Sequence, residues 1–407
     1  MSQFKVNINN SYEWFVAFYA WVLFYPFFVW QVPPSLIFVI SLLLFAPKLI
    51  DLQKTKASDG IFIIIMSVLY LVLLARSGGT GQVSVPGKIA GLVPIILFYT
   101  SPKFAKAIFE KFTTLFAFLI IPSIFMYVLV VIFEISIPYR IIPPLNEIKD
   151  GVYRQYPFLV IYQGVVFFDR FCGYFDEPGV VGTICAVLLA IRNFNLTNWI
   201  SISIFIAGVL STSMFFFGIS IMFLIYKVPL RYKLAIIGLV GVLVFVLYNN
   251  EIIYHLVFRR FSLTDDGTLA GINREGGSFA EWYEQFRHSE HYLWGLGRGF
   301  GALHNPGGAS FRQLIVDYGL IFFITYILSF SLYSLKRIGF NNNWVVYMML
   351  LLGIIFQRPF ILNIPYVMLL LFPIYMLSSE KDKCLQKKAF HVDDTDEEES
   401  ISIDKLV

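Results

Sequence analysis

Charge is scarce in this chain of 407 residues. Only 14% of the residues are Asp, Glu, Lys or Arg, whereas 57% are apolar. A soluble globular protein is about a quarter charged and about half apolar, so a water-soluble enzyme is excluded, as are disordered and collagen-like chains. At roughly 20 residues per transmembrane helix, the apolar residues suffice for about a dozen membrane helices and leave only loops outside them.

Cysteine is also scarce. The three cysteines, Cys172, Cys185 and Cys384, cannot build a disulfide framework, and none forms a CxxC motif. The pair His288-x-x-His291 has a spacing that can bind zinc on a helix, but no third ligand follows at a fixed spacing. We therefore interpret these histidines as surface residues and expect neither a metal nor a cofactor. No small-residue cleavage site follows the first apolar run, so we expect that run to remain as a membrane anchor.

Twelve apolar runs are present, and they predict an all-α, polytopic membrane helix bundle. They cover about 13–31, 34–50, 60–76, 86–100, 112–135, 178–191, 198–212, 213–226, 232–249, 312–334, 344–357 and 360–378. The uncharged stretch 193–226 is too long for one untilted helix, and Ser211-Thr212-Ser213 in its middle predicts two short helices that meet there. The run 158–168 is too short to span a membrane, so we interpret it as an interfacial or re-entrant segment.

The charges predict an orientation. With the N-terminus in the cytoplasm, the inside segments hold 15 lysines and 3 arginines, which satisfies the positive-inside rule and also places the C-terminus inside. The outside holds eleven arginines but only Lys88 and Lys149. Because the planar fork of arginine suits phosphate and carboxylate, we expect the external face to bind an anion. The alternative is that these arginines pair with lipid headgroups or with acidic loop residues. The eleven arginines predicted to be outside are Arg76, Arg140, Arg154, Arg170, Arg259, Arg260, Arg274, Arg287, Arg298, Arg312 and Arg358.

The same reading divides the chain into four parts. Residues 1–249 hold nine membrane helices and an external loop of about 136–177. Residues 250–311 form a large external loop, and residues 312–378 hold the last three membrane helices. The acidic tail 379–407 is interpreted as a disordered cytoplasmic segment.

The first candidate site is the segment FDRFCGYFDEPGVVG at 168–182. Arg170 and Glu177 precede a helix that we expect to start near Pro178, since proline suits the first helical position. A helix N-terminus together with an arginine makes a plausible phosphate site. Glu177 is then either a base or a partner of Arg170. The alternative is an ordinary helix start with a solvated ion pair.

The second candidate site is the segment 272–305. Its pattern from Arg274 through Trp282 predicts a short amphipathic helix that ends before Gly295. The glycines that follow resemble a nucleotide loop only superficially, because they do not follow a strand in a βαβ unit. We expect them instead to form a flexible backbone that places Arg298 and His304 against a ligand.

Three segments in order resemble the O-antigen polymerase and ligase superfamily of bacterial envelope polysaccharide assembly. They are RFCGYFDEPGVVGT, NREGGSFAEWYEQF with YLWGLGRGFG, and HNPGGASFRQLIVDYGLIFF. The matching positions are Arg170, Gly173, Phe175 and Pro178 in the first, Arg274, Trp282, Gly295, Gly297 and Gly299 in the second, and His304, Asn305, Gly319 and Leu320 in the third. Two departures, a longer spacing between Asn305 and Gly319 and no basic residue in LSTSMFFFG, favour the polymerase branch over the ligase branch.

The resemblance implies a GT-C-like glycosyltransferase in the bacterial inner (plasma) membrane. It would transfer a glycan from polyprenyl diphosphate to a sugar hydroxyl of another lipid-linked repeat unit. Expected partners are this lipid-linked oligosaccharide, membrane lipid and a chain-length regulator protein, but no nucleic acid. The alternatives are a ligase with a different acceptor and a non-enzymatic transporter. Transporters usually carry midplane charges and paired repeats, which this chain lacks.

The same resemblance assigns roles to individual residues. Glu177 or His304 is the expected base, because the attacking hydroxyl must lose a proton. Arginines are expected to stabilise the departing diphosphate, so that no metal is required. The expected diphosphate ligands are Arg170, Arg259, Arg260, Arg274 and Arg298.

Overall fold

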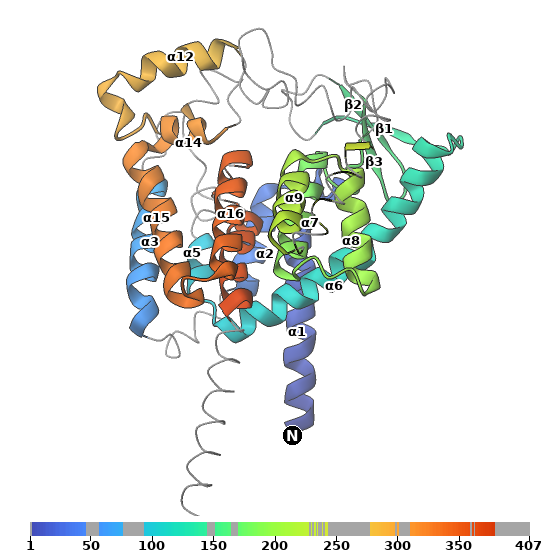
Figure 1. The fold of residues 1–407 in the computed structure, drawn as a ribbon, viewed down its shortest axis with the longest axis horizontal. Coiled ribbons are helices and arrows are strands. Elements are labelled where there is room, and N and C mark those ends of the chain that lie inside the picture. Colours follow the sequence, from blue (N-terminus) through green and yellow to red (C-terminus); the bar gives the residue numbers. More distant parts are fainter. Residues whose placement is uncertain are drawn as a thin grey trace, which may run out of the picture.

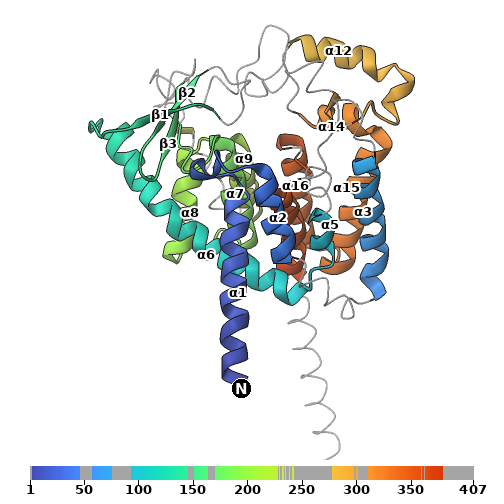
Figure 2. The same ribbon diagram turned by 180° about the vertical axis from the view of Figure 1, so that it is seen from behind.

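The computed structural model shows a mostly helical chain (Figure 1). It describes residues 2–45, 57–75, 93–144, 151–163, 170–227, 229, 232, 234, 238, 241–242, 277–297, 299–300, 310–358, 360–361 and 363–378. Most helices lie side by side. The end that carries the sheet, α12 and α14 is called the upper end below, and the opposite end, where α1 begins, is called the lower end (Figures 1 and 2).

The described helices follow the predicted apolar runs closely in the middle of the chain and less closely elsewhere. They are α1 (Ser2–Val22), the 3-10 turn η1 (Phe27–Val29), α2 (Pro34–Phe45), α3 (Ala57–Ala75), α5 (Val93–Phe98), α6 (Pro102–Tyr127) with the π-turn η3 (Val128–Ile132), α7 (Pro178–Ile191), α8 (Trp199–Leu210), α9 (Met214–Lys227), α12 (Gly277–Arg287), the 3-10 turn η6 (Glu290–Tyr292), α14 (Phe311–Tyr318), α15 (Leu320–Ile338) and α16 (Asn342–Gln357). A last helix covers Ile364–Ser378.

Two of the described helices are long and apolar enough to cross a membrane, namely Pro102–Ile132 and Leu320–Ile338. The other apolar helices in the described part are shorter, at 10–17 residues, so the bundle of about twelve spans is not confirmed. The exposed side chains of α15 include Ile321, Ile324, Leu328 and Leu332, which follow one face of the helix. A continuous exposed apolar face of this kind suits contact with lipid.

Helix α7 is the centre of the bundle. Every residue from Gly179 to Ile191 is buried, and the helix packs against α8, α9 and α16. A helix that is apolar on all sides belongs in a protein interior. Its start, which was predicted at Pro178, is confirmed.

The stretch 193–226 forms two helices, as predicted. Helix α8 ends at Leu210 and α9 begins at Met214, with Thr212 between them at a φ of 47°. The break packs on α7 so closely that a Cβ on Gly182 would overlap Ser213. The turn therefore lies at the upper end, beside the first turns of α7 (Figure 1).

A small antiparallel sheet lies at the upper end, in the region predicted to be an external loop. Its strands are β1 (Arg140–Ile142), β2 (Val152–Gln155) and β3 (Val160–Gln163), in the order β1-β2-β3. The prediction of an all-α chain is wrong here, and the run 158–168 supplies strand β3 where an interfacial segment was expected; residues 164–169 lie outside the described part. The strands have only 3 or 4 residues each, too few for an alternating pattern to stand out.

The predicted span 312–334 is divided at Gly319, where φ is 90°. The short helix α14 precedes this glycine, and α15 follows it. Helix α12 packs on α14 through Phe279, Tyr283 and Phe286 against Ile315 and Val316. The amphipathic helix predicted after Arg274 is thus confirmed, although it starts at Gly277 and extends to Arg287.

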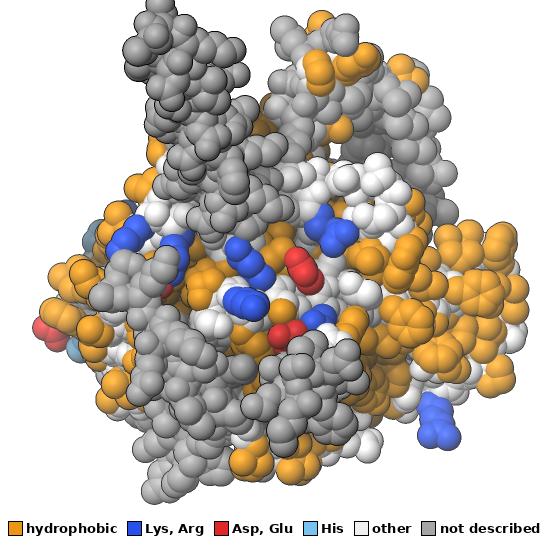
Figure 3. Space-filling view, turned by 90° about the horizontal axis from the view of Figure 1, so that it is seen from below, with side chains coloured by type: hydrophobic (Ala, Val, Ile, Leu, Met, Phe, Trp, Pro, Cys, Tyr) orange, Lys and Arg blue, Asp and Glu red, His pale blue; other side chains and the backbone are white. Residues whose placement is uncertain are grey.

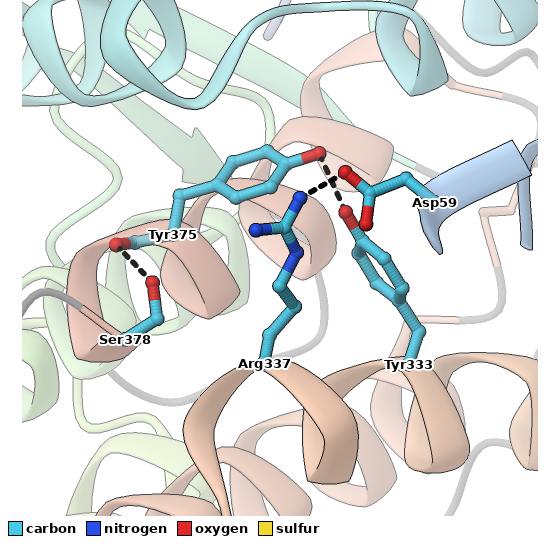
Figure 4. A network of polar contacts seen from close by, with 5 residues as sticks. All are labelled: Asp59, Tyr333, Arg337, Tyr375 and Ser378. Atoms are coloured by element: carbon cyan, nitrogen blue, oxygen red, sulfur yellow. Dashed lines mark hydrogen bonds and ion pairs between the residues drawn. The ribbon is translucent and has the colours of Figure 1, made fainter. Parts of the chain in front are cut away.

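The lower end is rich in basic residues. Lys and Arg side chains gather near the middle of this face, with apolar side chains around them (Figure 3). Lys336 and Arg337 lie in the last turn of α15, and Arg337 forms an ion pair with the buried Asp59 of α3. The hydroxyls of Tyr333 and Tyr375 lie 3.2 Å apart beside this pair, so the network joins α3, α15 and the last helix (Figure 4).

Candidate functional site

The first turn of α7 carries the candidate site. Pro178 takes the first helical position, and Glu177 precedes it in an extended conformation without a side-chain cap. Proline at this position costs no hydrogen bond, because the first N–H groups of a helix lack intrahelical partners. The helix start therefore presents a partial positive charge toward the upper end.

Arg358, directly after α16, lies against this helix start. Its Nη1 forms an ion pair with the Oε2 of Glu177. Its side chain is only 5% exposed, whereas that of Glu177 is 35% exposed. A Cβ at position 179 would overlap the guanidinium, so Gly179 provides the space that Arg358 occupies.

The position of Arg358 is electrostatically costly. A guanidinium beside the positive end of a helix is repelled, and burial opposes its charge. Burial by itself lowers the pKa of Arg358, but Glu177, together with Tyr366 and Asp176, outweighs this effect and leaves the pKa raised. The Nε of Arg358 is buried and has no hydrogen-bond partner among the described residues. The guanidinium is therefore desolvated, and the carboxylate of Glu177 compensates its charge.

Arg170 contacts the turn between α8 and α9, which lies next to α7. Its Nε donates to the Oγ1 of Thr212 at 2.8 Å, and its Nη2 donates to the backbone oxygens of Ser211 at 3.0 Å and Thr212 at 3.2 Å. The structure thus places the fork of Arg170 on the α8–α9 turn. Because that turn packs on Gly182 and Arg358 packs on Gly179, the two arginines border one face of α7 at successive turns.

The sheet is connected to this site through Tyr153 of β2. The hydroxyl of this buried tyrosine donates to the backbone oxygen of Asp176, directly before Glu177. Burial raises the pKa of Tyr153, so the hydroxyl stays protonated and remains a donor. The sheet is therefore fixed beside the start of α7.

The glycine-rich segment has a structural role that its sequence did not predict. The N–H of Gly297 donates to the backbone oxygen of Asp317, and the N–H of Gly299 donates to the Oδ2 of Asp317, both at 2.9 Å. Gly295 and Gly319 both have positive φ angles and pack backbone to backbone. The described glycines thus bind to the end of α14, where a flexible loop was expected.

The other five predicted site residues lie outside the described part of the chain. These are Arg259, Arg260, Arg274, Arg298 and His304. His288 follows α12, and the Nε2 of His291 in η6 lies 3.7 Å from the Oε1 of Glu290. Within the described residues, no group of three His, Cys, Asp or Glu side chains is placed to hold a metal ion.

Sequence reasoning placed Arg358 among the external arginines but did not select it as a site residue. One signal was available. Arg358 is the only charged residue between Arg337 and Glu380. A lone charge in so long an apolar stretch needs a partner or a function.

No known family model matches the chain, and neither the curated proteins nor the solved structures include one that is similar to it. The resemblance to polysaccharide polymerases therefore depends on the sequence motifs alone.

Proposed function

We propose that this protein is a membrane glycosyltransferase of the polysaccharide polymerase type. It transfers a glycan from polyprenyl diphosphate to a sugar hydroxyl of a second lipid-linked repeat unit. The observation that supports this best is the buried guanidinium of Arg358 at the start of α7, at one end of an apolar helix bundle. This location suits a ligand with an anionic head and an apolar tail, and a diphosphate on a lipid tail has both.

The donor binds with its two parts in different surroundings. The polyprenyl chain lies along apolar helix faces such as the exposed face of α15. The diphosphate lies at the start of α7, where backbone N–H groups and Arg358 provide positive charge. Arg170 holds the neighbouring α8–α9 turn in place. Arg259, Arg260, Arg274 and Arg298 remain expected further ligands of the diphosphate.

The reaction breaks the bond between the anomeric carbon and the diphosphate oxygen. A new bond forms between that carbon and the acceptor oxygen, and the acceptor proton passes to Glu177 or His304. Negative charge grows on the leaving diphosphate, and Arg358 stabilises it. Removing one such preorganised donor typically costs on the order of 100-fold to 1,000-fold in rate.

We also propose how the protein lies in the membrane. The upper end faces the outside of a bacterial plasma membrane, and both termini lie in the cytoplasm. Of the eleven arginines predicted to be external, the six in the described part lie on elements of the upper end or pack against them: Arg140, Arg154, Arg170, Arg287, Arg312 and Arg358 (Figure 1). The lower end, with Lys336 and Arg337, faces the cytoplasm.

The test uses the purified full chain in liposomes with a polyprenyl-diphosphate-linked repeat unit. We expect a polymer ladder that forms equally well in excess chelator, and a loss of roughly 100-fold for Arg358→Lys. The matched control is Arg287→Lys, because Arg287 lies at the same end and pairs with Glu284 on an exposed helix surface. A wild-type chain that joins no units would refute the proposal. Transfer of preformed polymer to another lipid, without a ladder, would indicate a ligase instead.

A further inference from the structure

A cavity of about 320 Å³ opens at the upper end, between the α1–α2 connection and the sheet. Figure 2 shows this connection and the sheet at the same end of the molecule. Its lining includes Phe28, Trp30, Gln31, Arg140, Ile142 and Gln155. The volume lies at the lower end of the range of small-molecule sites, which is about 300–1,000 Å³.

The sheet register brings polar and apolar groups together on one wall. Arg140 of β1 is paired directly with Gln155 of β2, so their side chains lie next to each other on the same face. Ile142 lies two residues along β1 from Arg140 and therefore on that face too. This wall presents a guanidinium, an amide and an aliphatic group side by side.

The facing wall is aromatic and rigid. The ring of Trp30 meets that of Tyr153 edge-on, with 5.1 Å between the ring centroids, and its Nε1 donates to the backbone oxygen of Tyr25 at 2.9 Å. Phe28 is half exposed, yet its ring is held against Trp21 at 5.6 Å. These rings are positioned by their neighbours without any ligand.

We propose that this cavity binds one or two sugar residues of a glycan. A sugar ring has an apolar face that packs on aromatic rings and hydroxyl groups that need both donors and acceptors. Gln31 and Gln155 supply both, and Arg140 supplies donors. A purely anionic ligand would leave the rings unused, and a purely apolar ligand would leave three polar side chains unpaired.

The cavity is separated from the candidate site by one buried side chain. Trp30 packs on Tyr153, and Tyr153 donates to Asp176, whose neighbour Glu177 pairs with Arg358. A glycan held in the cavity is therefore close to the start of α7. That this glycan is the acceptor rests on the proposed function, whereas the binding of sugar itself does not.

The experiment measures binding directly. The probe is the free repeat-unit oligosaccharide, released without lipid from the host's own surface polysaccharide by mild acid. It is titrated against the full chain in nanodiscs and followed by saturation-transfer NMR. We expect saturable binding by the wild type and roughly tenfold weaker binding by Gln155→Ala, since a hydrogen bond of about 1.4 kcal/mol is lost. Phe28→Ala should weaken binding similarly without disturbing the fold, because its side chain is half exposed.

The control is Gln163→Ala, an exposed glutamine on β3 of the same sheet, which should bind as the wild type does. No binding by the wild type, or equal affinity for Gln155→Ala and the wild type, would overturn the cavity as a sugar site. Binding that depends on Gln155, in a protein that makes no polymer from lipid-linked units, would instead refute the proposed function and leave the sugar site intact.

Discussion

Arg358 and Glu177 form an ion pair whose two members differ in their exposure to solvent. Arg358 is almost completely buried at the positive end of α7, so it depends on its partner. Glu177 is about one-third exposed, so water can solvate it if the arginine is removed. The pair places a strongly positive group beside a helix start at the cost of a desolvated charge.

Stability measurements on this pair should reveal that asymmetry. Glu177→Ala leaves a buried charge unpaired and should destabilise the protein by about 3 kcal/mol or more. Arg358→Ala should cost less, and the double variant should be more stable than Glu177→Ala alone. Thermal unfolding of the detergent-purified proteins measures all three. Strictly additive effects of the two substitutions would show that the pair is not coupled.

Arg170 should not tolerate replacement by lysine. Its Nε and Nη2 together reach one hydroxyl and two backbone oxygens of the α8–α9 turn, which a single ammonium group cannot reproduce. We expect Arg170→Lys and Arg170→Ala to lose polymer formation to a similar, large extent while the protein still inserts.

The matched control for Arg170 is Lys149→Ala, which removes the same charge from the segment 136–177 that is predicted to be external, and which should be nearly neutral. Polymer length on gels, at matched membrane expression, provides the comparison. Full-length ladders from Arg170→Lys would rule out the need for a fork. Equal defects in Lys149→Ala would reduce the effect to general surface charge.

Among the helices and loops, the junction where Gly295 packs on Gly319, between α14 and α15, should tolerate a side chain least. Gly319 has a φ of 90°, and a Cβ there would lie 2.5 Å from the carbonyl carbon of Trp294. Gly319→Ala should therefore destabilise the junction by about 3 kcal/mol and expose the external loop to protease.

Gly218 in α9 serves as the control for that substitution. It has open space around its Cα, so Gly218→Ala should be neutral or stabilise the chain by up to about 1 kcal/mol. Thermal unfolding and limited proteolysis of both variants test the difference. Equal stability of the two variants would contradict the close packing of Gly295 on Gly319.

What the sequence could predict depended on how local the signal was. Pro178 marks the start of α7, and Ser211 to Ser213 mark the α8–α9 break, because both features act within one helical turn. The short strands β1 to β3 were missed, since their stability comes from pairing between strands. The Arg358–Glu177 pair joins two helices far apart in sequence, so no local pattern could reveal it. The break at Gly319 has a local signal, a glycine inside an apolar run, but such a glycine is also compatible with an unbroken helix.

The whole molecule has two chemically different ends. The described arginines of the upper end lie on or beside the sheet, α12 and the start of α7, whereas the lower end groups basic residues of α6 and α15 with Arg192, which follows α7. Between the two ends, the exposed side chains of α15 and of α3 are largely apolar. This distribution suits a membrane between the ends, and the proposed orientation places the lower end inside.

Cysteine labelling tests this orientation. In a Cys384→Ser background, the two remaining native cysteines are buried, so introduced cysteines report alone. His291→Cys at the upper end should react with an impermeant maleimide in intact cells, because its side chain is half exposed. Asn342→Cys, at the start of α16 near the lower end, should react only after lysis. The opposite pattern would invert the topology and remove the proposed site from the outside of the cell.

In the proposed reaction, glycan transfer at the start of α7 releases polyprenyl diphosphate. The most direct measurement counts the released polyprenyl diphosphate and the new glycosidic bonds in the same liposome reaction. We predict one diphosphate released per bond formed, for the wild type and for Arg287→Ala, and almost none for Arg358→Ala. Bonds formed without diphosphate release, or undiminished release by Arg358→Ala, would contradict it.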